Sequence, residues 1–289
     1  MIEADGNTKI FGVFGDPVKH SLSPFMHNAA FRSLKLNCIY LPFWVKKSSL
    51  GNALKCVAAL DICGVNLTIP HKAEAVKYLD ELDEEAKLIG AVNTIKVENG
   101  KLKGYNTDGR GIIRALREDC KFNPKGRDIL IIGAGGSARA VAIHLALNKA
   151  RRIVIANRTR QRAKEIVRDI ILHTGCNAID IPLKESAITG EAGKIHLLIN
   201  TTSIGMNPKD SRLVKEKFFK KASNLQLVYD LVYEPSRTQL LKDAKRWRIK
   251  AFNGMGMLLY QGALSFEIWT GKKAPLQIMK RALYKAAKS

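Results

Sequence analysis

Apolar residues recur along the chain with two different spacings. Short apolar runs such as Ile129–Ile132 predict buried strands, whereas stretches such as Ala138–Leu145, with apolar residues three and four positions apart, predict amphipathic helices. The two patterns alternate along the chain, without an internal repeat or a low-complexity tract. This alternation predicts an α/β protein with largely parallel sheets.

The first part of the chain predicts a small α/β unit that ends in a hairpin. Its expected elements are a strand at Ile10–Gly15, a helix from Pro24, a strand at Ile39–Trp44, a helix to Leu60, a strand at Val65–Ile69 and helical residues through Leu88. Two further strands, Val92–Val97 and Leu102–Asn106, flank Asn99-Gly100. This dipeptide favours a type I′ turn, because both of its residues accept positive φ angles.

A second α/β unit begins at Asp128, after a predicted helix at Gly109–Cys120 and the helix breaker Asn123-Pro124-Lys125-Gly126. Its expected strands are Ile129–Ile132, Ile153–Ala156, Leu197–Asn200, Leu227–Leu231 and Lys250–Phe252. This arrangement outlines a doubly wound nucleotide-binding domain. The chain then reads as helical to its end, with a break at Gly271–Pro275, and these helices can pack on either domain. We therefore expect domains at residues 1–108 and 109–255, followed by helices at 256–289.

Composition excludes several classes of protein. The 289 residues are 46% hydrophobic, which is enough for two ordinary cores, and the apolar runs are far shorter than the roughly 20 residues that span a bilayer. The N-terminus carries acidic residues, Glu3 and Asp5, where a signal peptide carries positive charge. The five cysteines and six histidines show no metal-ligand spacing. We expect a cytoplasmic protein without a metal ion, a disulfide or a membrane partner.

The formal charge of +22 changes this picture, because a strongly basic balance is also typical of nucleic-acid binders. Residues 1–108 contain 13 basic and 12 acidic residues, so 35 of the 48 basic and 14 of the 26 acidic residues follow Asp108. Nearly all of the surplus therefore lies in the second part of the chain. A phosphate-rich cofactor needs only two or three cations, so we interpret most of this charge as solvated surface and expect no nucleic-acid partner.

A glycine-rich turn joins the first strand of the second unit to its first helix. The run Gly133-Ala134-Gly135-Gly136-Ser137-Ala138 matches the pattern G-x-G-x-x-A directly after the apolar strand Ile129–Ile132. Glycines at these positions allow a tight turn and a close approach of backbone N–H groups to a pyrophosphate at the helix N-terminus. The six residues of this run are therefore candidate cofactor ligands.

The end of the second strand indicates which dinucleotide is bound. Sites that prefer NAD place an acidic residue there to accept from the ribose 2′-hydroxyl. This strand ends instead in Asn157-Arg158-Thr159-Arg160, so we expect the Arg158 guanidinium to bind the 2′-phosphate of NADP. For Arg160 and Arg162, a phosphate contact and simple solvation are both open.

Two serines precede the first helix of the chain. Pro24 suits the first helical position and Ser23 the N-cap, but capping leaves Ser21 unexplained. Two hydroxyls beside a helix N-terminus can also bind a small carboxylate.

The strand at Val65–Ile69 carries polar residues on one face. Asn66 and Thr68 alternate with apolar neighbours and lead to Lys72, while Asn93 and Asp108 lie at the ends of other predicted strands. We expect these side chains to contribute to one polar site.

Seven motifs, in family order and over nearly the whole chain, resemble the shikimate dehydrogenase family. They are Ser21–Pro24, Asn66–Lys72, Gly90–Thr94, Gly104–Gly109, Gly133–Ala140, Asn157–Thr159 and Asn253–Gln261. The resemblance implies an N-terminal substrate domain, a Rossmann domain for NADP, and C-terminal helices that return to the substrate domain. It implies reduction of 3-dehydroshikimate to shikimate, on the route to chorismate and the aromatic amino acids. Ser137 stands where alanine is common in the family.

The same resemblance assigns roles to individual residues. Lys72 and Asp108 would be the catalytic pair, with Ser21 and Ser23 on the substrate carboxylate. Asn66, Thr68, Asn93 and Gln261 would contact the ring hydroxyls or orient the pair. Tyr233 would border the substrate, and Thr201, Gly254 and Met257 the nicotinamide, although core packing explains Met257 equally well. His71 is a rival acid–base residue that we expect to point elsewhere, because side chains alternate along a strand.

Three further hypotheses remain open from the sequence. One is a quinate/shikimate dehydrogenase that uses NAD as well as NADP, and another is a non-catalytic ligand-sensing or nucleic-acid-binding relative. The third is that two copies of the chain form a homodimer.

Overall fold

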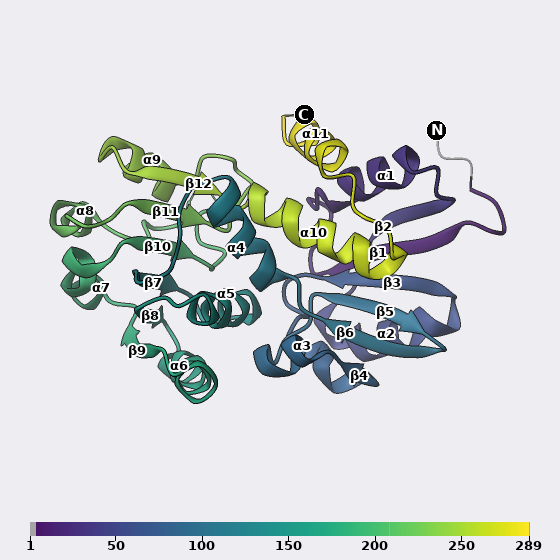
Figure 1. The fold of residues 1–289 in the computed structure, drawn as a ribbon, viewed down its shortest axis with the longest axis horizontal. Coiled ribbons are helices and arrows are strands. Elements are labelled where there is room, and N and C mark those ends of the chain that lie inside the picture. The colour runs from purple at the N-terminus through teal and green to yellow at the C-terminus, as the bar shows by residue number, and fades with distance from the viewer. Residues whose placement is uncertain (1–3, 208, 289) are drawn as a thin grey trace. The chain divides into compact units, whose positions relative to one another are not determined.

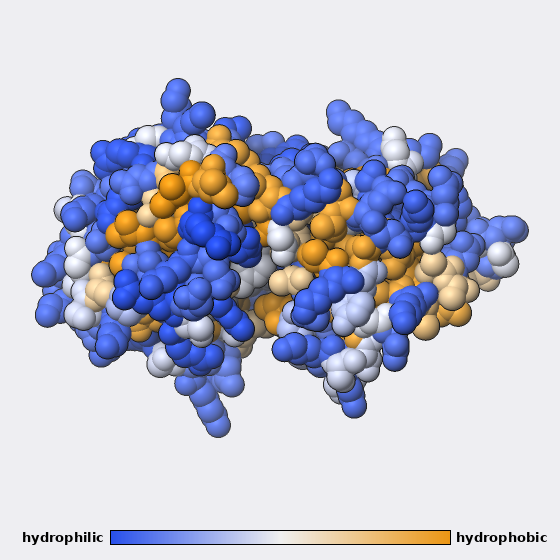
Figure 2. All heavy atoms as spheres, turned by 90° about the horizontal axis from the view of Figure 1, so that it is seen from below, coloured by the Kyte–Doolittle hydropathy of each residue, from blue (hydrophilic) through white to orange (hydrophobic). Residues whose placement is uncertain are grey.

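The computed structural model describes residues 4–207 and 209–288. Two compact units divide the chain: one contains the residues up to Gly111 and those from Leu258 onward, and the other contains Ile112–Met257. The two boundaries fall inside helices α4 (Asp108–Glu118) and α10 (Met255–Thr270). Within the described residues, no helix combines the length and apolar character that a membrane crossing requires. Hydrophilic side chains cover much of the face shown in Figure 2.

The first unit is built on a six-stranded mixed sheet with the order β2-β1-β3-β5-β6-β4. The strands are β1 (Lys9–Gly15), β2 (Cys38–Trp44), β3 (Ile62–Leu67), β4 (Glu81–Leu82), β5 (Thr94–Glu98) and β6 (Lys101–Tyr105). Strand β1 runs parallel to β2 and β3, whereas β5 is antiparallel to both of its neighbours. The first sheet is therefore less parallel than the alternating pattern suggests, because the hairpin reverses the chain.

Helices cover both faces of this sheet (Figure 1). The helices of this unit are α1 (Ser23–Ser33), α2 (Leu50–Ala59), α3 (Glu84–Ile89), α10 and α11 (Leu276–Ala286), with short 3-10 helices η1 (Lys47–Ser49) and η2 (Glu74–Tyr78), and α11 packs on α1. On the face that α1 and α10 cover, the ring of His27 stacks on Tyr40 with 4.4 Å between centroids, and both pack near Trp269. On the other face, Leu50, Leu54 and Val57 of α2 belong to an apolar core. Trp269 therefore anchors α10 to the sheet through its packing against His27 and Tyr40.

The hairpin between β5 and β6 is confirmed. Asn99 and Gly100 have φ angles of 52° and 75°, the positive values that a type I′ turn requires. The continuous helical stretch expected through Leu88 is wrong, because η2, β4 and α3 occupy this segment. The Asp80 carboxylate accepts a hydrogen bond from the Leu102 N–H (2.7 Å), and Asp83 caps α3 by accepting from the Ala86 N–H (2.7 Å). The Asp80 side chain and the backbone N–H groups of Asp80 and Asp83, which donate to the Leu102 and Gly104 oxygens, hold the segment against β6.

The second unit contains a fully parallel sheet with the order β12-β11-β10-β7-β8-β9. Its strands are β7 (Asp128–Ile132), β8 (Arg152–Asn157), β9 (Asn177–Pro182), β10 (Leu197–Asn200), β11 (Leu227–Asp230) and β12 (Lys250–Asn253). Its other helices are α5 (Gly136–Leu147), α6 (Arg160–Thr174), α7 (Glu185–Glu191), η3 (Ala192–Lys194), α8 (Glu216–Lys221) and α9 (Gln239–Arg246). The strand order reverses between β7 and β10, so the prediction of a doubly wound domain is confirmed.

One strand of this sheet is absent from the sequence-based expectation. Strand β9 lies at the sheet edge beside β8, carries Asp180 in its middle and ends at Pro182. A half-exposed edge strand needs few apolar residues, and proline is tolerated where no partner requires the N–H group. The central strand β7 was easier to find, because all of Ile129–Ile132 is fully buried.

Candidate functional site

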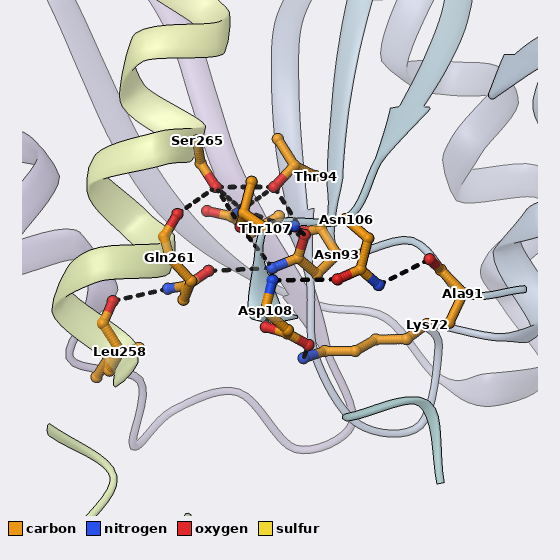
Figure 3. Close-up of polar contacts among 11 residues, drawn as sticks. Lys72, Ala91, Asn93, Thr94, Asn106, Thr107, Asp108, Leu258, Gln261 and Ser265 are labelled. Atoms are coloured by element: carbon orange, nitrogen blue, oxygen red, sulfur yellow. Dashed lines mark hydrogen bonds and ion pairs between the residues drawn. The ribbon is translucent and has the colours of Figure 1, made fainter. Parts of the chain in front are cut away.

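A lysine–aspartate pair lies at the centre of the polar cluster in the first unit. Lys72 follows β3, and Asp108 begins α4 directly after β6. The Lys72 Nζ and Asp108 Oδ2 atoms are 2.5 Å apart, and their side chains are 15% and 3% exposed (Figure 3). Exposed ion pairs are common and contribute little to stability. In this pair, by contrast, the carboxylate is almost completely buried. The pair can hold an ammonium group in place as a proton donor or a fixed positive charge.

Asn93 holds the second oxygen of the Asp108 carboxylate. Its Nδ2 donates to Asp108 Oδ1 (2.9 Å), lies 2.8 Å from Thr107 Oγ1 and reaches Gln261 Oε1 at 3.2 Å. Its Oδ1 accepts from the Thr107 backbone N–H at 2.8 Å. Both carboxylate oxygens therefore have partners, one in Lys72 and the other in Asn93. The predicted residues Lys72, Asn93, Asp108 and Gln261 thus form one hydrogen-bonded cluster.

Asn66 joins this cluster from the neighbouring strand. Its Nδ2 lies 3.0 Å from the Asn93 carbonyl oxygen and 3.1 Å from Ser265 Oγ, and its Oδ1 accepts from the Tyr40 hydroxyl at 2.7 Å. The sequence reasoning did not assign Tyr40 or Ser265 to the site. Ser265 follows Gln261 by four residues, and this helical spacing was the available signal for it. No pattern in the sequence pointed to Tyr40.

Thr68 and the two serines lie outside this cluster. In the described part of the chain, no hydrogen bond joins them to Lys72, Asn93 or Asp108. Strand β3 ends at Leu67, and the expected extension to Ile69 is wrong: Ile69 is 60% exposed. Pro70 follows and has no N–H with which to continue a strand ladder.

The first turn of α1 differs from the expected capping. The helix begins at Ser23, so Leu22 occupies the N-cap position, and no side chain caps the helix there. The prediction of Ser23 as the N-cap is therefore wrong. The Ser21 Oγ instead accepts a long hydrogen bond of 3.4 Å from the Ser23 N–H. Both hydroxyls still lie beside the N-terminus of an 11-residue helix, where an anion is favoured.

His71 faces away from the lysine–aspartate pair. Its ring is fully buried, and Nε2 lies 2.8 Å from the Val45 carbonyl oxygen. Burial lowers the pKa of His71, while the Val45 carbonyl opposes this effect. The neutral ring is thus engaged with the backbone, and Lys72 is the titratable residue of this segment that meets Asp108.

The glycine-rich turn of the second unit has the geometry of a phosphate loop. Gly133 has a φ of 117°, and a Cβ atom there would lie only 2.3 Å from Thr201 Oγ1, so no larger residue fits. Nothing lies within 4 Å of the Cβ position of Gly135, which leaves the approach to the backbone open. The turn opens the 12-residue helix α5, whose first N–H groups have no intrahelical acceptor. The six predicted residues form this turn (Gly133–Gly135) and the start of α5 (Gly136–Ala138), an arrangement that fits a pyrophosphate.

The turn after β8 leaves one arginine available. Asn157 Nδ2 donates to the Thr159 carbonyl oxygen (2.8 Å), which shapes the turn around the exposed Arg158. Arg158 forms no ion pair within the described residues, whereas Arg160 Nε is 2.5 Å from Asp180 Oδ2 on β9. A carboxylate therefore holds the Arg160 guanidinium, and a phosphate contact of Arg160 or Arg162 stays a hypothesis. The exposed Arg158 guanidinium is available to a 2′-phosphate.

The remaining predicted residues follow the carboxyl ends of strands β10, β11 and β12. Thr201 Oγ1 donates to the Ile132 carbonyl oxygen (2.8 Å), and a Cβ on Gly254 would lie 2.1 Å from the Leu231 oxygen. The Met257 N–H donates to the Tyr229 hydroxyl (3.1 Å), and its side chain is buried. Burial raises the pKa of Tyr233 to about 12, so this phenol stays neutral and can donate a hydrogen bond.

Among the described residues, no group of three or more His, Cys, Asp or Glu side chains is placed to hold a metal ion.

Three family models match the chain in succession. They describe the shikimate dehydrogenase substrate binding domain at residues 13–95, shikimate / quinate 5-dehydrogenase at 117–203, and the shikimate 5′-dehydrogenase C-terminal domain at 254–284. Together these matches cover most of the sequence and include Lys72 and the glycine-rich turn.

Individual relatives match over almost their full length. The shikimate dehydrogenase (NADP(+)) of Desulforamulus reducens is 46% identical over 281 residues, which cover 97% of this chain and 96% of that protein. A crystal structure of a shikimate dehydrogenase in complex with NADP+ is 42% identical with a TM-score of 0.88, covering 98% and 97% of the two chains. The shikimate 5-dehydrogenase of Listeria monocytogenes, in complex with shikimate and NAD, is 36% identical with a TM-score of 0.86, covering 96% and 97%.

Proposed function

The chain belongs to the shikimate dehydrogenase family, and from this membership we propose that it interconverts 3-dehydroshikimate and shikimate with NADP. The observation that carries the proposal is the nearly buried pair of Lys72 and Asp108, with both carboxylate oxygens bound. A dehydrogenase that acts on a ketone needs a fixed cation and proton donor of this kind. A ligand sensor or a nucleic-acid-binding protein does not.

The chemistry of the pair follows from the charge that develops during the reaction. Reduction of a ketone places growing negative charge on the carbonyl oxygen, and the Lys72 ammonium can stabilise this charge and then donate a proton. Asp108 orients the ammonium and accepts a hydrogen bond from a neighbouring substrate hydroxyl. In the oxidative direction the steps reverse, and the proton of the hydroxyl passes to the Lys72 amine. The nicotinamide, when bound, supplies or accepts the hydride.

We assign substrate contacts to the polar residues of the first unit. Ser21 and Ser23 would bind the ring carboxylate beside the N-terminus of α1, where the helix dipole favours negative charge. Thr68 and Gln261 would meet the ring hydroxyls, and Asn93 would orient the catalytic pair through its bond to Asp108 Oδ1. Tyr233 of the second unit, whose phenol has a pKa raised further by burial and stays neutral, would donate a hydrogen bond to the substrate.

We assign NADP to the second unit. Its pyrophosphate would lie on the turn Gly133–Ala138, and its 2′-phosphate on the unpaired Arg158 beside Asn157 and Thr159. Thr201, Gly254 and Met257 would border the nicotinamide. By this assignment the first unit is the substrate domain, to which the C-terminal helices belong, and the second is the cofactor domain.

Location and assembly are part of the same proposal. The cysteines are free thiols in this structure, which fits a reducing cytoplasm. We include a homodimer as the proposed assembly. The molar mass measured by light scattering distinguishes a homodimer from a monomer.

One assay tests the function and its main alternative. NADP and NAD are each offered with shikimate and with quinate, and reduction of the cofactor is followed by absorbance. We expect the highest kcat/KM for shikimate with NADP, because Arg158 has no acidic neighbour in its turn. Comparable efficiencies with quinate and NAD would establish the dual-specificity enzyme instead, and no turnover in any combination would refute the proposal. Binding to nonspecific DNA at low salt tests the nucleic-acid alternative.

A further inference from the structure

We propose that Asn66 is a positioning residue and does not contact the substrate. With Tyr40 and Ser265 it would fix Asn93 and, through Asn93, the pair of Asp108 and Lys72. This inference rests on the proposed function, because it concerns the same reaction. It replaces the role of a ring-hydroxyl ligand that the family resemblance implied for Asn66.

The polar atoms of Asn66 already have protein partners. A side-chain amide offers one oxygen acceptor and two N–H donors. The oxygen accepts from the Tyr40 hydroxyl (2.7 Å), while Nδ2 has three oxygens within 3.1 Å, from Asn93, Thr94 and Ser265. Because Asn66 is 6% exposed, a bond to substrate would require one of these partners to be released inside the protein. The arrangement therefore favours a structural role for this amide.

The network continues from Asn66 to the carboxylate of Asp108. Ser265 Oγ and Thr94 Oγ1 are 2.7 Å apart, and Thr94 Oγ1 donates to Asn93 Oδ1 at 3.0 Å. Together with the Thr107 N–H, this contact fixes the Asn93 oxygen on one side and turns Nδ2 toward Asp108 Oδ1. Figure 3 shows Ser265, Thr94 and Asn93 in sequence above Asp108. The orientation of the carboxylate thus depends on hydroxyls that lie farther from Lys72.

Helix α10 enters the network at two points one helical turn apart. Gln261 Oε1 meets Asn93, and Ser265 meets Asn66 and Thr94. Ser265 is fully buried, as are Tyr40 and Thr94, so these groups have no access to a ligand and act through Asn93. Lys72 ends in a flexible chain, and a carboxylate held at both oxygens limits the positions of its ammonium. Loss of this restraint should slow the chemical step more than it weakens substrate binding.

Two single substitutions remove hydroxyls and little else. Tyr40→Phe keeps the ring that stacks on His27 but removes the donor to Asn66, and Ser265→Ala removes the hydroxyl from α10. A matched pair, Thr94→Val and Thr94→Ser, removes or keeps the hydroxyl at one position. Thr270→Val is the control, because Thr270 lies on the same helix and bonds the carbonyl four residues earlier, as Ser265 does, outside the network.

We expect Tyr40→Phe, Ser265→Ala and Thr94→Val each to lower kcat about three- to tenfold, the effect of one lost hydrogen bond. The KM values for shikimate and NADP should change less than twofold. Shikimate deuterated at the carbon that loses the hydride should give a larger isotope effect on kcat than in wild type, while Thr94→Ser and Thr270→Val should behave as wild type. Tm is measured for every variant, so that a rate change is compared between folded enzymes.

The opposite results identify the rival roles. A raised KM for shikimate with unchanged kcat would make Asn66 a substrate ligand and overturn the inference. A lower Tm with unchanged kcat and isotope effect would reduce the network to stability alone, which also overturns it. If the wild type itself does not oxidise shikimate, the proposed function fails and the inference fails with it. If the wild type is active and these variants have the same kcat, KM and isotope effect as the wild type, the inference is refuted while the proposed function stands.

Discussion

The preference for NADP should depend on one arginine. Arg158 is exposed and forms no ion pair within the described residues, so its guanidinium is available to a 2′-phosphate. A hydrogen bond to a charged group contributes about 1.5–3 kcal/mol. Since about 1.4 kcal/mol corresponds to a factor of ten, Arg158→Ala should lower kcat/KM for NADP by about ten- to a hundredfold. The value for NAD should change little, because NAD has no phosphate at this position.

The double variant Asn157→Asp with Arg158→Ala should shift the preference further. It adds a carboxylate that can accept from the ribose 2′-hydroxyl of NAD. The gain for NAD should be smaller than the loss for NADP, because Asn157 Nδ2 now donates to the Thr159 oxygen and a carboxylate cannot. The neighbouring Arg162 also keeps the surrounding field positive.

Arg160→Ala provides the matched control in the same turn. Its guanidinium is held by Asp180 at 2.5 Å, so its removal should leave the ratio of NADP to NAD efficiency within about twofold, the scale of a weak surface contact. The assay is kcat/KM for both cofactors in all variants at one ionic strength, because salt screens such contacts. An unchanged ratio in Arg158→Ala, or an equal loss in Arg160→Ala, would refute the assignment of the phosphate to Arg158.

Two further predictions concern the first unit. Ser21→Ala combined with Ser23→Ala should raise KM for shikimate with little loss of stability, because Leu22 and not Ser23 occupies the N-cap; unchanged substrate saturation would remove both hydroxyls from the site. His27 is fully buried, and both ring nitrogens lack a partner within the described structure. Burial lowers its pKa from 6.5 to about 3, so its neutral form stabilises the fold above pH 6.5 and this contribution is lost as the pH falls toward about 3. At two pH units below 6.5 the loss is about 2–3 kcal/mol, and His27→Phe, which keeps a ring against Tyr40, should flatten the fall in unfolding free energy measured with denaturant. An equally steep fall in His27→Phe would show that other groups cause it.

The order of elements was largely predictable because most strands are continuous apolar runs. Ile129–Ile132 is buried on both faces, and the Asn-Gly turn fixes the hairpin by its backbone preference. The prediction failed where tertiary contacts override local pattern. Strand β9 lies at the edge of its sheet with an Asp in its middle, and the segment 74–89 is held against β6 by the Asp80 side chain and by backbone bonds from Asp80 and Asp83.

In the candidate site, too, the sequence predicted the residues but not the contacts that the fold creates. Lys72, Asn93, Asp108 and Gln261 were assigned from their motifs, and the structure brings their polar atoms together. The burial of a polar side chain and its number of partners are properties of the folded protein, so the sequence could not distinguish a saturated Asn66 from a free one. The arginines after β8 illustrate the point, because the carboxylate that holds Arg160 comes from a strand that the sequence did not indicate.

The central claim is that Lys72 and Asp108 act as one unit on the substrate in the first domain. The most direct measurement compares kcat and NADP affinity in Lys72→Ala, Asp108→Asn and the double variant, with the cofactor Kd obtained by titration calorimetry. We predict a loss of most turnover in each single variant, a double variant little worse than either single variant, and a Kd for NADP close to that of the wild type. A loss of NADP affinity equal to the loss of rate, or fully additive effects of the two substitutions, would contradict this account.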